Sequence, residues 1–143
     1  MVIDTSALLA IPQEEPEHRS FNEAIEAADR RRTSTATFLE CSMILESRYG
    51  SAALRDLDHF IARAQITIFS VDVEQARIAR DAFHQFGKGR HPAGLNFGEC
   101  FAYALSCVLT AALLFKGRTF TQTDVLHETL PKHSIQDCGY RTR

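Results

Sequence analysis

Three acidic residues stand at positions where an α/β protein can bring them together. Asp4 follows the apolar run Met1–Ile3, whereas Glu40 and Glu99 lie near the starts of two helical segments. The carboxyl ends of parallel strands and the helix starts that follow them meet at one sheet edge, so we expect the three carboxylates to face one cleft. Converging carboxylates repel one another unless a hard cation lies between them, which favours Mg²⁺ or Mn²⁺. Such a site can activate water for phosphodiester hydrolysis.

Each acid also has a purely structural interpretation. Asp4 precedes Thr5 and Ser6 at a helix start, where an aspartate caps free backbone N–H groups. The spacing of Thr37 to Glu40 is that of a capping box, and Asn96 to Glu99 has the same spacing. Taken singly, each glutamate is explained as well by capping as by chemistry, and only their convergence favours a site.

The elements that must position these acids alternate between strands and helices. Apolar or β-branched runs predict strands at 1–3, 33–35, 66–69, 112–115 and 123–126. Helical spacing of apolar residues predicts helices over 7–10, 16–28, 37–50, 52–64, 72–83 and 96–110. Alternation of this kind indicates βαβ units, and therefore a parallel sheet with helices on both faces. We expect one domain over residues 1–126 and a polar C-terminal tail, disordered or on the surface, over 127–143.

Composition excludes several classes of protein. The 143 residues carry a formal net charge of −2, so contact with nucleic acid requires a local basic patch. Lys88, Arg90, Lys116 and Arg118 are the candidates for holding phosphates beside the acids. The four cysteines form no CxxC pair, which indicates a reduced, cytoplasmic chain. We see no signal peptide and no apolar run near the ~20 residues of a membrane span, and expect no membrane partner.

Five segments together resemble PIN-domain ribonucleases of the VapC toxin type. They are MVIDTSALLA at 1–10, TATFLE at 35–40, GKGRHPAGLNFGEC at 87–100, FAYAL at 101–105 and LLFKGRTFTQTD at 113–124. The resemblance implies a three-layer α/β/α fold with a parallel, five-stranded sheet. It also implies a homodimer, Mg²⁺-dependent cleavage of an RNA substrate, and inhibition by a cognate VapB-type antitoxin.

The resemblance assigns roles to individual acids. Asp4 matches the family's first acid and Glu40 its helix glutamate, while Glu99 stands where the family usually has Asp. Thr119 stands where the family commonly has a fourth acid, so Asp124, the nearest remaining carboxylate, is taken in its place. The expected catalytic set is therefore Asp4, Glu40, Glu99 and Asp124, with Asp4 and Glu99 as the metal ligands.

Two functions follow from this set. The first is a metal-dependent endoribonuclease that acts as the toxin of a VapBC-type toxin–antitoxin pair. The second is a catalytically weakened PIN protein that binds RNA or an antitoxin without efficient cleavage, and the departures at Glu99 and Thr119 favour it. Phosphoryl transfer of the haloacid-dehalogenase type is disfavoured, because it requires a second Asp two residues after Asp4 and Ser6 stands there.

Overall fold

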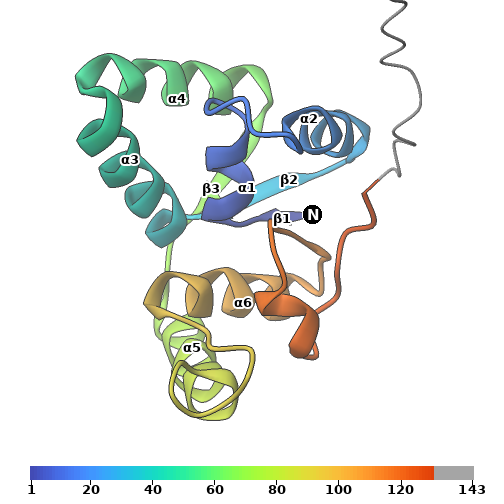
Figure 1. Ribbon diagram of the computed structural model, residues 1–143. Coiled ribbons are helices and arrows are strands. Elements are labelled where there is room, and N and C mark those ends of the chain that lie inside the picture. Colours follow the sequence, from blue (N-terminus) through green and yellow to red (C-terminus); the bar gives the residue numbers. More distant parts are fainter. Residues whose placement is uncertain (131–143) are drawn as a thin grey trace, which may run out of the picture.

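Four parallel strands form the central sheet of the computed structural model, which describes residues 1–130 (Figure 1). In spatial order they are β3 (Ile66–Phe69), β2 (Arg31–Ser34), β1 (Val2–Ile3) and β4 (Leu113–Leu114). Every pairing is parallel, with Val2 opposite both Arg32 and Leu113. The parallel arrangement predicted from the alternation of strands and helices is confirmed.

Helices cover both faces of this sheet (Figure 1). One layer contains α1 (Thr5–Ala10), α2 (His18–Ala27), α3 (Thr35–Tyr49) and α4 (Ser51–Arg63), and the other contains α5 (Val73–Phe86) and α6 (Phe97–Leu109). The predicted three-layer α/β/α architecture is therefore confirmed. A short 3₁₀ helix, η1 (Thr119–Gln122), follows β4 beside α6.

The strands β1 and β4 have two residues each but contribute to both layers of the core. Ile3 and Leu114 are buried in the cluster under α1–α4, whereas Val2 and Leu113 are buried in the cluster under α5 and α6. Side chains of successive strand residues point to opposite faces, so two residues suffice to anchor both layers. This explains why the strands read as continuous apolar runs in the sequence.

The expected fifth strand at 123–126 is not formed, and the prediction of five strands is wrong for the described residues. Only a single bridge pairs Leu113 with His127, supported by hydrogen bonds from Leu113 N to Leu126 O and from Glu128 N to Leu113 O. The residues before this bridge form local hydrogen bonds instead of a strand. The hydroxyl of Thr121 donates to Arg118 O, and the hydroxyl of Thr123 donates to Phe120 O. Such local bonds compete with a strand ladder.

Helix boundaries agree with the sequence prediction to within a few residues. Gly50, with φ of 78°, ends α3 in a backbone conformation that favours glycine. Asp72 caps α5 by accepting a hydrogen bond from Gln75 N at 2.8 Å. The start of α3 differs: Ser34 caps it and the helix begins at Thr35 rather than Thr37.

The predicted tail begins at the sheet edge, since His127 forms a bridge with Leu113 and Glu128 N donates to Leu113 O. The remainder of that tail, residues 131–143 with Cys138, lies outside the described residues. Within residues 1–130, none of the helices is both long enough and apolar enough to cross a membrane.

Candidate active site

Asp4 is the buried centre of the candidate site. It follows β1 directly and caps α1, and only 2% of its surface is exposed. Its Oδ2 accepts hydrogen bonds from Ser6 N at 3.0 Å and Ser6 Oγ at 2.7 Å. Ser6 Oγ in turn accepts from Lys116 N at 2.9 Å, which ties the carboxylate to the end of β4. The capping role expected for Asp4 is therefore real, but it uses one oxygen only.

The second oxygen of Asp4, Oδ1, is buried and has no hydrogen-bond partner. Leaving a buried carboxylate oxygen unpartnered is costly in a folded protein, and such an orphan calls for an explanation such as an ion or a water. Burial raises the pKa of Asp4 above its ordinary value and the charge of Glu40 adds to the increase, while the bonds from Ser6 oppose it. A cation at this position would relieve both penalties.

Glu40 reaches the site from α3. Because Ser34 is the cap of that helix, Glu40 lies in its second turn, and the capping-box interpretation of Thr37 and Glu40 is wrong. Its Oε2 instead accepts a hydrogen bond from Thr5 Oγ1 at 2.6 Å, which joins α3 to α1.

Gly98 gives Glu40 the space that it occupies. A Cβ at position 98 would lie 2.6 Å from Glu40 Oε1, a separation that real Cβ atoms essentially never show. Gly98 is not among the site residues predicted from the sequence, although a glycine in the first turn of a helix, directly before an acid, can indicate a close approach of another group.

Glu99 lies in the first turn of α6 and makes the capping box that its spacing predicted. Its Oε2 accepts from Asn96 N at 2.8 Å, and its own N–H donates to Asn96 Oδ1 at 2.9 Å. Burial raises the pKa of Glu99 and the charges of Asp4 and Glu40 add to this, against hydrogen bonds from Asn96 N and the Thr119 hydroxyl. Glu99 is thus a structural cap that also faces the other two acids.

Asp124 lies outside this group. Tyr103 Oη donates to Asp124 Oδ1 at 2.7 Å, and the charge of Asp124 raises the pKa of Cys107. Tyr103 lies one turn beyond Glu99 along α6, and Cys107 lies two turns beyond it. The charges that raise the pKa values of Asp4 and Glu99 come from within the group of three, not from Asp124. The structure thus brings together Asp4, Glu40 and Glu99. The 3₁₀ turn of η1 presents Thr119 to them and directs Asp124 to Tyr103.

The arrangement suits a divalent cation that is bound by few protein ligands and keeps several of its waters. Among residues 1–130, no three His, Cys, Asp or Glu side chains are close enough together to enclose a metal ion. Mg²⁺ does not require such a cage, because it commonly binds one or two carboxylates and keeps several waters. The unpartnered Oδ1 of Asp4, with two further carboxylates nearby, fits an ion of that kind.

The four cations proposed to hold phosphates beside the acids differ in their contacts and exposure. Lys116 forms ion pairs with Glu15 and Glu17, the latter at 3.5 Å, so it is already neutralised. The guanidinium of Arg90 lies 5.3 Å from the centroid of the Phe83 ring. Lys88 and Arg118 are exposed.

The two cysteines beside the acids, Cys41 and Cys100, are buried. Burial, and to a smaller extent the charges of neighbouring carboxylates, raises the pKa of Cys41 to about 12 and the pKa of Cys100 to about 11. They are therefore packing groups rather than reactive thiols.

Comparison with known proteins identifies the family. Residues 1–126 match the PIN domain. The chain belongs to the PIN-domain family. Its relatives include Ribonuclease VapC30 of Mycobacterium tuberculosis, 45% identical over 92% of this chain and 100% of that one. Ribonuclease VapC of Mycolicibacterium smegmatis is 48% identical over 87% of this chain and 97% of that one. The predicted membership of the VapC ribonucleases is confirmed.

Solved structures of low sequence identity share the PIN fold. Mycobacterium tuberculosis VapC20, described as a sarcin–ricin loop cleaving toxin, superposes with a TM-score of 0.73 at 14% identity, over 91% of this chain and 98% of that one. A toxin–antitoxin complex from Klebsiella pneumoniae superposes with a TM-score of 0.63 at 14% identity, over 86% of this chain and 92% of that one. At this identity the likeness concerns the fold alone.

Proposed function

We propose that this PIN-domain protein is a divalent-metal-dependent endoribonuclease that hydrolyses RNA phosphodiesters at Asp4, Glu40 and Glu99. The observation that carries the proposal is the convergence of three carboxylates, from the cap of α1, from α3 and from α6, around a buried Asp4 oxygen without a hydrogen-bond partner. Ribonuclease VapC relatives at 45% and 48% identity support the choice of RNA as substrate.

Asp4 and Glu99 are the proposed ligands of Mg²⁺ or Mn²⁺. When bound, such an ion lowers the pKa of a coordinated water and neutralises charge that develops on the phosphate. The protein's own part is positional: Ser6 fixes one oxygen of Asp4, and Thr5 fixes one oxygen of Glu40. Glu40 remains free to accept a proton through its other oxygen and is the proposed general base.

Cleavage of single-stranded RNA by the purified protein tests this proposal. We expect cleavage that requires Mg²⁺ or Mn²⁺, stops with a chelator, and is lost in Asp4→Asn and Glu40→Gln. A matched control is Asp72→Asn, which changes a capping aspartate of α5 outside the site. Activity that survives a chelator, or that survives Asp4→Asn, would contradict the assignment.

A second candidate is a weakened PIN protein that binds RNA or an antitoxin without efficient cleavage. Two observations favour it: Glu99 is held in a capping box, and a neutral Thr119 stands beside it. RNA binding with no detectable metal-dependent cleavage would select this candidate over the first.

We also propose that the protein is the toxin of a VapBC-type pair, binding a cognate VapB-type antitoxin, and that it forms a homodimer. The toxin–antitoxin complex with the same fold supports the first part. Exposed Leu39 and Met43 on α3 support the second, since large apolar side chains on one helix face favour a protein contact. Growth arrest on expression, relieved by co-expression of a VapB-type antitoxin, tests the pairing. Light scattering tests the dimer.

A further inference from the structure

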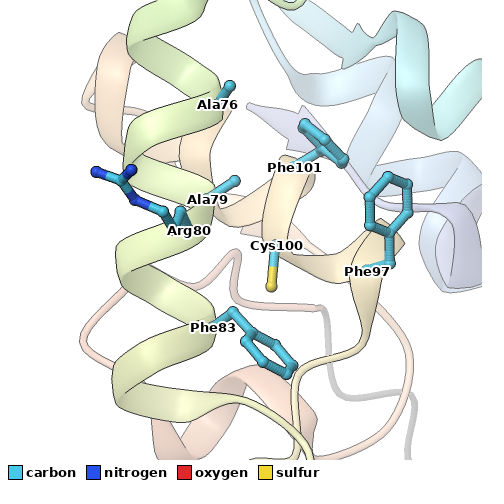
Figure 2. Close-up of a pocket in the computed structure, with 7 residues that line it drawn as sticks. All are labelled: Ala76, Ala79, Arg80, Phe83, Phe97, Cys100 and Phe101. Atoms are coloured by element: carbon cyan, nitrogen blue, oxygen red, sulfur yellow. The ribbon is translucent and has the colours of Figure 1, made fainter.

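An aromatic cavity opens between α5 and α6, next to the acids. It encloses about 400 Å³. Figure 2 shows the rings of Phe83, Phe97 and Phe101 around the sulfur of Cys100, with Ala76 and Ala79 on the side formed by α5. A volume of this size lies in the range of small-molecule sites, roughly 300–1,000 Å³.

Two of the three rings that form the cavity, those of Phe83 and Phe97, are not accounted for by core packing. Phe97 is 80% exposed, and Phe83 is 38% exposed. The Phe97 and Phe101 rings meet edge to face, with centroids 5.0 Å apart, so Phe97 keeps a free face. Phe97 lies within the helical segment predicted over 96–110, and its exposure shows that it is not a core residue. Large exposed aromatic side chains beside a cavity indicate a binding surface.

The cavity and the acids share one helical turn. Gly98 in the first turn of α6 contacts Glu40, and Glu99 faces Asp4 and Glu40. Phe97 and Cys100, three residues apart and so on one face of the helix, line the cavity. The first turn of α6 therefore carries both residues that line the cavity, Phe97 and Cys100, and residues that meet the acids, Gly98 and Glu99.

The cavity also lies in a segment with an excess of cations. Segment 73–94 contains four cations, Arg77, Arg80, Lys88 and Arg90, against two acids, Glu74 and Asp81, whereas the whole chain has a net charge of −2. The Arg80 guanidinium points away from the cavity toward solvent, while its stem lines the wall (Figure 2). Arg90 lies over the Phe83 ring. Cations at the rim of an apolar, aromatic cavity suit a ligand with a flat ring and a charged backbone.

We propose that this cavity is a base-binding subsite, in which Phe97 stacks on a nucleobase of single-stranded RNA next to the phosphate held at the acids. The inference rests on the proposed ribonuclease function and adds the subsite that places the strand. Aromatic stacking on unpaired bases with cations along the backbone is a general mode of single-strand recognition. An apolar side chain of a protein partner would use the aromatic rings but not the cations.

The test uses short single-stranded RNA containing one 2-aminopurine, whose fluorescence is quenched by stacking, with a chelator present so that the RNA stays intact. We expect quenching by the unchanged protein, loss of quenching in Phe97→Ala, and its retention in Phe97→Tyr. Affinity should fall about tenfold for Phe97→Ala and for RNA with an abasic site at the same position, the usual range for one stacked base. The control is Leu126→Ala, an exposed apolar residue on another segment.

Two results would overturn the subsite while leaving the ribonuclease proposal intact, because the unchanged protein would still cleave RNA. One is equal affinity and equal quenching in Phe97→Ala and the unchanged protein. The other is a drop from dimer to monomer mass in Phe97→Ala, which would make the cavity an interface between copies of the chain. If the unchanged protein neither binds nor cleaves RNA, the ribonuclease proposal itself fails, and the subsite fails with it.

Discussion

The carboxylate of Glu40 occupies the space in which residue 98 would carry its Cβ, and Gly98 leaves that space open. A Cβ there would lie 2.6 Å from Glu40 Oε1. One glycine on α6 thus sets how closely α3 can bring its acid to the other two, although the residue itself has no chemistry.

Gly98→Ala should therefore impair cleavage without unfolding the protein. The added methyl group displaces the Glu40 carboxylate, and a displacement of about 1 Å in an active site can cost 10²-fold in rate. Alanine is the better helix former by up to about 1 kcal/mol, which offsets part of the strain. We expect RNA cleavage about 100-fold slower with a melting temperature within a few degrees of the original.

A double variant separates this clash from a general effect on α6. Glu40→Asp shortens the side chain by one methylene group and so removes the atoms that the new methyl would meet. The loss in Gly98→Ala combined with Glu40→Asp should be smaller than the product of the two single losses, because residues in contact are not additive. Strict additivity would mean that the methyl group acts elsewhere.

Thr5 is expected to act as a positioning residue for Glu40. Its hydroxyl donates to Glu40 Oε2 at 2.6 Å and is largely buried. Thr5→Val keeps the shape and removes the bond, so the carboxylate loses its fixed orientation, and we expect about tenfold slower cleavage with a stability loss of roughly 1 kcal/mol. Thr5→Ser, which keeps the hydroxyl, should retain most activity. Similar rates for the Val and Ser variants would argue against this role.

The sequence was enough to predict the parallel three-layer fold and the three converging acids. The reason is that strand ends, helix caps and apolar periodicity are local signals, and the parallel topology then brings the strand ends to one edge. The fifth strand predicted at 123–126 is absent for the opposite reason, because its pairing is not decided by local signals. Whether Val125 pairs or turns inward depends on the short β4 and on hydroxyl bonds around η1, which are decided by three-dimensional context.

The same limit explains the misassigned side chains. Asp124 adjoins the family's motif in sequence, but a 3₁₀ turn separates it from the acids and pairs it with Tyr103. Phe97 falls within a helix of apolar periodicity, yet it is the first residue of α6 and is 80% exposed. Contacts between distant segments, such as Gly98 with Glu40, leave only weak traces in one sequence.

The pKa shifts predict how stability depends on pH in the metal-free protein. Asp4 and Glu99 have pKa values raised above their ordinary values, chiefly by burial. In the folded state they keep protons that the unfolded chain has already lost, so stability is greatest below their ordinary pKa, near 4, and falls as pH rises through the raised values.

Asp4→Asn should remove the largest part of this dependence. The amide oxygen can still accept from Ser6, but no charge is buried, so the metal-free variant should melt about 3 °C or more above the original at neutral pH. Mg²⁺ should raise the melting temperature of the original protein and not of the variant. Asp72→Asn is the control for loss of a helix-capping charge. An unchanged pH profile in Asp4→Asn would contradict the prediction.

Thr119→Asp should tighten metal binding and speed cleavage. The Thr119 side chain acts on Glu99 by lowering its pKa, so a carboxylate at this position adds a fourth negative charge beside the proposed ion. A charge about 4 Å from a divalent cation is worth a few kcal/mol in a partly solvated cleft before desolvation costs. Because Mg²⁺ readily keeps water in a vacant position, the realised gain should be smaller, about tenfold in affinity.

Calorimetric Mg²⁺ titration and single-turnover cleavage, run on both forms, measure the two effects separately. Thr121→Asp is the matched control, because it adds the same charge to η1 at an exposed position. The gain in Mg²⁺ affinity and cleavage rate should appear in Thr119→Asp alone. In the metal-free state Thr119→Asp should be less stable than Thr121→Asp, since its new charge faces Glu99 and Asp4 with no cation to compensate it. Equal gains in both variants would mean that added negative charge acts at long range, and Thr119 would then have no special place beside the ion.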